Sequence, residues 1–143
     1  MYTVLILDPE PRMRDLVRTI LNKGGYRVLE AEGFVEVMEA IEHETPDLVL
    51  VDVTQGSADA GFDLLHEIRL LPRMRSVPVL FTTGIPDQHI EDRLRNCGAT
   101  AYLMKPFNRQ DLLVAVGIAL GLQGAAAGAA AAAVPLYASV RAS

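Results

Sequence analysis

The sequence predicts an α/β fold in which helices cover both faces of a five-stranded parallel sheet. The first 120 residues alternate five short apolar runs with longer segments whose apolar residues recur at helical spacing. The third run, LVLV, is apolar at every position, which is typical of a strand buried on both faces. Because each strand is followed by a helix, right-handed crossovers are expected to build a doubly wound sheet.

The elements follow from these runs in chain order. The predicted strands cover residues 3–7, 26–31, 48–51, 77–81 and 100–104. The predicted helices cover residues 12–22, 34–43, 62–71, 86–96 and 109–120. In the first helix, Met13, Leu16, Val17 and Ile20 are expected to face the core. Asn108 is a typical N-cap for the last helix, and residues 54–61 (TQGSADAG) have the composition of a loop.

Composition excludes several classes of protein. A chain of 143 residues is expected to form one domain with a real core. The net charge of −5 argues against direct, non-specific nucleic-acid binding, which needs a basic face. The single cysteine, Cys97, excludes an internal disulfide and a cysteine-based zinc site. The N-terminus has no basic leader and reaches Asp8 early, so we expect a cytoplasmic setting.

Polar residues follow four of the five predicted strands. Asp8, Asp52, Thr83 and Lys105 come at the ends of the first, third, fourth and fifth strands. In a doubly wound fold these ends lie at one edge of the sheet, where ligands bind. Two carboxylates suit Mg²⁺, an aspartate can act as a nucleophile, and a lysine can neutralise a transferred phosphoryl group. The sequence therefore predicts a site that accepts a phosphoryl group.

Several motifs in matching order resemble the receiver domain of bacterial response regulators. They are LILDPEPRMR, PDLVLVD, GFDLLHEIR, VPVLFTTG and GATAYLMKPF. The resemblance runs from about residue 2 to residue 120. The resemblance implies a flavodoxin-like fold with strand order 2-1-3-4-5. It also implies a signalling domain of a two-component phosphorelay rather than a conventional enzyme.

The resemblance implies a role for each site residue. Asp52 would be the phosphoacceptor, supplied by a sensor histidine kinase or a phosphotransfer protein. Mg²⁺ would be held by Asp8, Asp52 and the backbone carbonyl of Thr54. Thr83 and Lys105 would bind the phosphoryl group.

The resemblance also implies a route from the site to a partner. Tyr102 would be a switch aromatic that moves with Thr83 and changes a surface for a downstream protein target. The Lys105–Pro106 bond would be a cis peptide.

One departure from the family pattern affects the metal site. Receiver domains normally carry two adjacent acids after the first strand, whereas this chain has Asp8-Pro9. Glu10 could substitute for the missing acid, but we expect weak Mg²⁺ binding.

The loop after Asp52 is a second departure from the family pattern. It carries Gly56 in place of a common proline and is one residue longer. A degenerate pseudo-receiver, which binds proteins without being phosphorylated, is therefore the alternative.

The sequence divides into a receiver domain, residues 1–121, and an Ala/Gly-rich tail, residues 122–143. Alanine favours helix, so the last helix is expected to continue to Val134 and to end at Pro135. On such a helix, four glycines would form one stripe: Gly117, Gly121, Gly124 and Gly128. The tail is interpreted as a linker to an output domain, as a helix that pairs in a homodimer, or as a membrane helix. The membrane interpretation is the weakest, because alanine and glycine are only weakly lipophilic.

Overall fold

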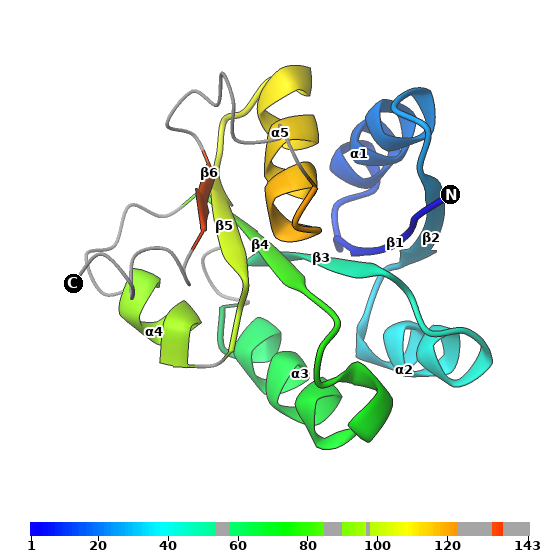
Figure 1. The fold of residues 1–143 in the computed structure, drawn as a ribbon, viewed down its shortest axis with the longest axis vertical. Coiled ribbons are helices and arrows are strands. Elements are labelled where there is room, and N and C mark those ends of the chain that lie inside the picture. Colours follow the sequence, from blue (N-terminus) through cyan, green and yellow to red (C-terminus); the bar gives the residue numbers. More distant parts are fainter. Residues whose placement is uncertain (54–57, 85–89, 97, 123–132, 136–143) are drawn as a thin grey trace.

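The computed structural model covers the whole chain and describes residues 1–53, 58–84, 90–96, 98–122 and 133–135 (Figure 1). The strands are β1 (Thr3–Leu7), β2 (Arg27–Ala31), β3 (Leu48–Val53), β4 (Val79–Thr83), β5 (Ala101–Met104) and β6 (Ala133–Pro135). The helices are α1 (Pro11–Lys23), α2 (Phe34–His43), α3 (Ala58–Leu70), a 3₁₀ turn (Pro72–Met74), α4 (Ile90–Asn96) and α5 (Arg109–Ala119).

The sheet has the order β2-β1-β3-β4-β5-β6. Strands β1 to β5 are parallel, which confirms the predicted order 2-1-3-4-5 and the doubly wound fold. Strand β6 pairs antiparallel to β5 and extends the sheet by one strand that the sequence did not predict.

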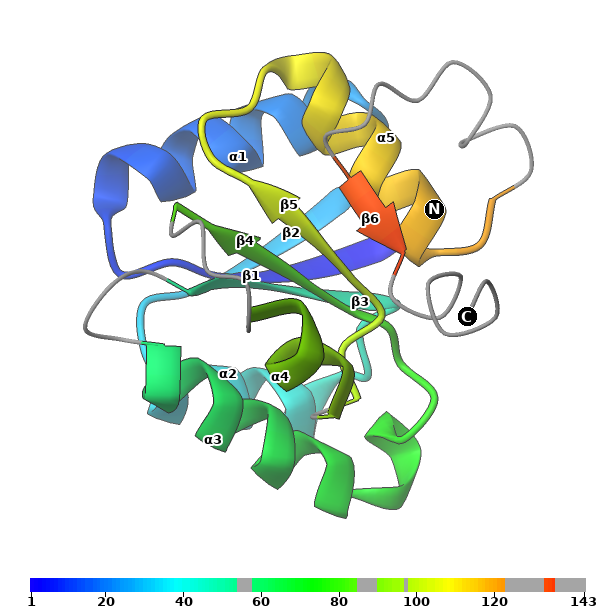
Figure 2. The same cartoon turned by 90° about the vertical axis from the view of Figure 1, so that its left-hand side faces the viewer.

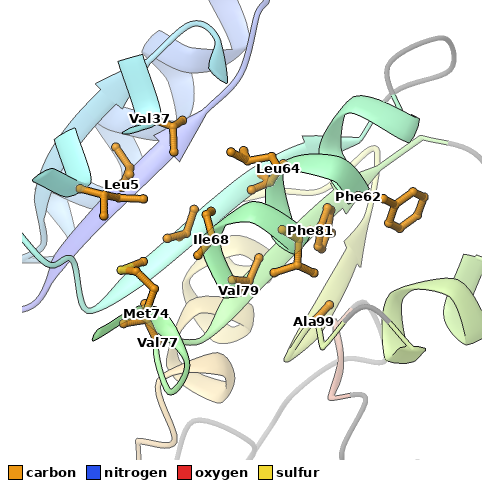
Figure 3. Close-up of a cluster of buried hydrophobic side chains, with 14 of the residues drawn as sticks. Leu5, Val37, Phe62, Leu64, Ile68, Met74, Val77, Val79, Phe81 and Ala99 are labelled. Atoms are coloured by element: carbon orange, nitrogen blue, oxygen red, sulfur yellow. The ribbon is translucent and has the colours of Figure 1, made fainter. Parts of the chain in front are cut away.

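Helices cover both faces of this sheet. Helices α1 and α5 lie on one face, and α2, α3 and α4 lie on the other (Figure 2). Strand side chains alternate between the two faces, so each central strand contributes to two cores. Leu5, Val51 and Phe81 pack toward α2, α3 and α4, in the cluster shown in Figure 3. Ile6 and Leu50 pack toward α1 and α5. The doubly apolar strands are thus buried on both faces, as their sequence predicted.

Several boundaries differ from the prediction, and so does the burial of one residue in α1. Strand β4 begins at Val79 rather than at residue 77, because Pro78 has no N–H and the amide of Val77 bonds to the carbonyl of Met74 in the preceding turn. Helix α3 begins at Ala58, so residues 58–61 of the predicted loop are helical, and residues 54–57 lie outside the described residues. In α1, Leu16 is 48% exposed, whereas Leu21, which was not singled out, is fully buried.

The predicted continuation of the last helix to Val134 is wrong. Helix α5 ends at Ala119, and Gly121 follows with a positive φ of 73°. The amide of Leu122 bonds to the carbonyl of Gly117 at 2.9 Å, and the amide of Gly121 bonds to Ile118 at 3.0 Å. This pattern is a Schellman motif, which closes a helix with a left-handed glycine.

The predicted glycine stripe fails with the longer helix. Gly117 is buried within α5, and Gly121 lies beyond its end. Gly124 and Gly128 lie outside the described residues. Because α5 ends at Ala119, the four glycines do not share one continuous helix. The predicted homodimer remains a prediction. Among the helices that the structure describes, none is long and apolar enough to cross a membrane.

Candidate functional site

The site lies where β1, β3, β4 and β5 end at one edge of the sheet. Asp8 follows β1, Asp52 lies near the end of β3, and Lys105 follows β5. Both aspartates are buried, with Asp8 5% and Asp52 6% exposed. Two buried acids at a strand edge need compensation, because an unpaired buried charge is costly.

Lys105 and Thr82 compensate the Asp52 carboxylate. The ammonium Nζ of Lys105 lies 2.5 Å from Oδ1 of Asp52. The hydroxyl of Thr82 donates to the same oxygen at 3.0 Å. Parallel pairing places Asp52 and Thr82 opposite one another, so their side chains share one face of the sheet.

The backbone fixes the position of Lys105. Its amide donates to the carbonyl of Thr83 at 2.7 Å, which continues the β4–β5 pairing past the end of β5. The Lys105–Pro106 peptide bond is cis, as predicted.

Asp8 is held by the first turn of the chain after β1. Its Oδ1 accepts from the backbone amide of Glu10 at 2.9 Å, and its carbonyl accepts from Arg14 at 2.8 Å. Burial raises the pKa of the Asp8 carboxyl, the hydrogen bond from Glu10 counters this, and the charge of Asp52 raises it further. The Lys105 ammonium acts in the opposite direction. Asp8, Asp52 and Lys105 are therefore electrostatically coupled.

Glu10 is the N-cap of α1. Its carboxylate accepts from the amides of Arg12 at 3.2 Å and Met13 at 2.6 Å, one on each oxygen. These bonds satisfy amides that the start of a helix leaves unpaired. Both carboxylate oxygens of Glu10 therefore bond at the start of α1, and its alternative role as a metal ligand stays a prediction.

Among the described residues at this edge, the carboxylates of Asp8 and Asp52 are the side chains that could bind a divalent cation. Within the described residues, no group of three His, Cys, Asp or Glu could hold a metal ion. The paired carboxylates of Asp8 and Asp52 are hard oxygen donors, and the charge of Asp52 already disfavours ionisation of Asp8. This donor set fits Mg²⁺, which commonly uses one or two carboxylates and keeps several waters. Thr54, whose carbonyl was the third predicted ligand, lies outside the described residues.

The remaining predicted site residues lie in the adjacent strands. Thr83 is fully buried in β4, one residue beyond Thr82. Tyr102 is half-buried in β5, opposite Phe81, and packs against the cluster under α2, α3 and α4. Their predicted switch roles remain predictions. Sequence reasoning missed Thr82, although the pair of threonines at the end of β4 is a signal that either hydroxyl could face the site.

A cavity of about 190 Å³ opens beside Asp52. Its lining is mostly apolar and includes Leu7, Pro9, Phe34 and Leu64. Asp52 is among the residues that line this cavity.

The comparisons with known proteins agree on one family. The family model of the response regulator receiver domain matches residues 4–117. The chain is 35% identical over 118 residues to the transcriptional regulatory protein PdtaR of Mycobacterium tuberculosis, covering 82% of this chain and 56% of PdtaR. It therefore spans about half the length of that relative.

Solved structures give the same result. A response regulator receiver domain protein from Methanospirillum hungatei is 30% identical with a TM-score of 0.74, covering 85% of this chain and 94% of that one. The chemotaxis response regulator CheY4 of Vibrio cholerae is 26% identical with a TM-score of 0.76, covering 83% of this chain and 98% of that one. With the strand order and the acidic edge described above, these matches show that the chain belongs to the response-regulator receiver domain family of two-component signalling systems.

Proposed function

We propose that this receiver domain accepts a phosphoryl group on Asp52 from a histidine kinase or a phosphotransfer protein. The observation that supports this most strongly is the buried Asp52 carboxylate, 2.5 Å from the Lys105 ammonium and coupled to Asp8. Buried titratable groups of opposite charge at a strand edge are typical of functional sites.

The proposed step is a displacement at phosphorus. An oxygen of Asp52 forms a bond to the phosphorus of a phosphohistidine while the phosphorus–nitrogen bond breaks. The electron pair of that bond stays on the imidazole, which takes a proton from solvent, and Asp52 becomes an acyl phosphate. The Lys105 ammonium is positioned to transfer its contact from the carboxylate to the phosphoryl oxygens.

Asp8 and Asp52 are the residues that would hold Mg²⁺. When bound, the ion neutralises charge on the phosphoryl oxygens. We propose that its affinity is low, because Pro9 has no side-chain ligand and Glu10 caps α1. The carbonyl of Thr54 remains a proposed third ligand.

The output belongs to the same proposal. Phosphorylation would shift the population of conformers around β4 and β5, through Thr83 and Tyr102, toward one that binds a downstream protein target in the cytoplasm.

A second candidate is a pseudo-receiver that binds proteins without phosphorylation. The observation in its favour is the two-carboxylate site, with Pro9 next to Asp8 and both oxygens of Glu10 bonded to α1 amides.

Intact mass after incubation with acetyl phosphate separates the two candidates. The chain is incubated at a series of Mg²⁺ concentrations, with Asp52→Asn as the control. The proposal expects one added phosphoryl group on the wild type, increasing with Mg²⁺, and none on the variant. An unmodified wild type at the highest Mg²⁺ concentration would favour the pseudo-receiver.

A further inference from the structure

Among the described residues, Thr82 makes a hydrogen bond to Asp52 that the proposed function does not use. Thr82 is 4% exposed and donates to Oδ1 of Asp52 at 3.0 Å. Lys105 contacts that same oxygen. One oxygen of the carboxylate thus has two donors.

The two donors differ in how easily they can move away from Oδ1 of Asp52. Lys105 has a flexible side chain and follows the end of β5, so its ammonium can move to an incoming phosphoryl group. Thr82 has a short, stiff side chain on β4, and strand pairing holds it opposite Asp52. The Thr82 hydrogen bond is therefore expected to persist after phosphorylation.

We propose that Thr82 keeps Oδ1 as the carbonyl oxygen of the acyl phosphate, directs the phosphoryl group to Oδ2, and shortens the lifetime of the phosphorylated state. This inference rests on the proposed phosphorylation of Asp52. It assigns to Thr82 a direct effect on the reacting carboxylate, beside the phosphoryl-binding role predicted for Thr83.

The effect on lifetime follows from the charge on Oδ1. During hydrolysis, water attacks phosphorus and loses a proton to solvent, and the bond from phosphorus to Oδ2 breaks. Its electron pair returns to the carboxylate, and inorganic phosphate leaves. Negative charge then develops on Oδ1, where the hydrogen bond from Thr82 becomes charge-assisted and stronger. A contact that is stronger in the transition state than in the ground state accelerates the step.

The test compares three full-length proteins: wild type, Thr82→Val and Thr82→Ser. Valine keeps the shape of threonine without the hydroxyl, and serine keeps the hydroxyl. Each protein is phosphorylated with acetyl phosphate and Mg²⁺, the donor is removed by rapid desalting, and intact mass follows the phosphorylated fraction with time. We expect Thr82→Val to lengthen the half-life about fivefold, the scale of a partly developed charge-assisted hydrogen bond. Thr82→Ser should keep the half-life within about twofold of wild type.

The outcomes separate the inference from the function on which it rests. An unchanged or shorter half-life in Thr82→Val overturns the inference alone. A Thr82→Ser half-life that matches Thr82→Val also overturns it, because packing rather than the hydroxyl would then be responsible. A wild type that takes up no phosphoryl group overturns both the proposed function and the inference. Thr82→Ala is the second hydroxyl-free variant if Thr82→Val does not fold, and the same half-life criterion applies to it.

Discussion

Arg69 is expected to be a major contributor to the stability of the strands that carry the site. It lies in the last turn of α3, and its guanidinium donates to the carbonyls of Met74 and Val77, both at 2.6 Å. It also donates to Gly98 at 2.9 Å and more weakly to Arg75 at 3.3 Å. These carbonyls lie in the segments that lead into β4 and β5, so one side chain ties both strands to α3.

Replacing Arg69 with methionine removes a hydrogen-bond donor from each of these carbonyls, although that of Met74 still accepts from the amide of Val77. Val77 is buried, and leaving its carbonyl without a donor costs about 1–3 kcal/mol. Each of the other three lost hydrogen bonds costs about 0.5–1.5 kcal/mol. The Arg69 side chain is half-buried, and this partial desolvation lowers the pKa of its guanidinium. Methionine avoids the cost of burying that charge, which offsets part of the loss. We therefore expect Arg69→Met to lower the free energy of unfolding by about 3 kcal/mol. For a chain of this size the melting temperature should fall by about 10 °C.

Urea unfolding followed by circular dichroism measures this loss. Arg73→Met is the matched control, because Arg73 is exposed and donates to one carbonyl, that of Ile41, at 3.1 Å. We expect the control to lose less than about 1 kcal/mol. If Arg69→Met loses no more than Arg73→Met does, the four carbonyl contacts do not stabilise the fold and the reasoning is refuted.

The other predictions concern the first turn of the chain after β1. Pro9→Asp should tighten Mg²⁺ binding about tenfold by titration calorimetry, because it supplies a further carboxylate; unchanged or weaker binding would contradict our assignment of that position. Glu10→Ala should lower the free energy of unfolding by about 1 kcal/mol in urea, since α1 loses its N-cap, yet leave Mg²⁺ affinity unchanged; a large loss of affinity would show that Glu10 is a ligand. Burial raises the pKa of the Asp8 carboxyl, so this carboxyl stays protonated to higher pH in the folded chain than in the unfolded chain. Ionisation of Asp8 therefore lowers the free energy of unfolding. Asp8→Asn should therefore stabilise the metal-free protein at pH 7, with a gain that disappears as the pH falls to about 3.9; a gain that grows toward acid pH would reverse this assignment.

The fold could be predicted because its signals are local and repeated. Each strand is apolar over consecutive positions, and each is followed by a segment with helical spacing. The same pattern predicted that Asp8 and Asp52 lie at strand ends. In the structure they do, and the charge of Asp52 raises the pKa of Asp8. A parallel sheet brings such ends together whatever their separation in sequence.

Which threonine hydroxyl lies next to Asp52 depends on the pairing register of β3 and β4, and no local sequence pattern predicts that register. Thr82 and Thr83 are adjacent, and a shift of one residue exchanges the faces to which they point. Pairing with β3 places Thr82 opposite Asp52. The predicted start of β4 is two residues too early because the apolar run 77–81 includes Pro78, which has no N–H for strand pairing.

Glu10 and the tail show competition between local preferences. A glutamate that could reach a metal can also cap a helix, and its distance from Asp8 does not decide between the two roles. For the tail, the helix propensity of alanine predicted continuation beyond Ala119, but Gly121 closes the helix. A single left-handed glycine that satisfies terminal carbonyls outweighs a propensity that is small for each residue.

The most direct test of the central claim is a crystal structure of the chain with Mg²⁺ and beryllium fluoride, an analogue of a phosphoryl group. The account predicts density for the analogue on an oxygen of Asp52, with the ammonium of Lys105 turned toward a fluoride. Density that shows Asp52 without the analogue and still paired with the Lys105 ammonium, at saturating Mg²⁺ and beryllium fluoride, would contradict it.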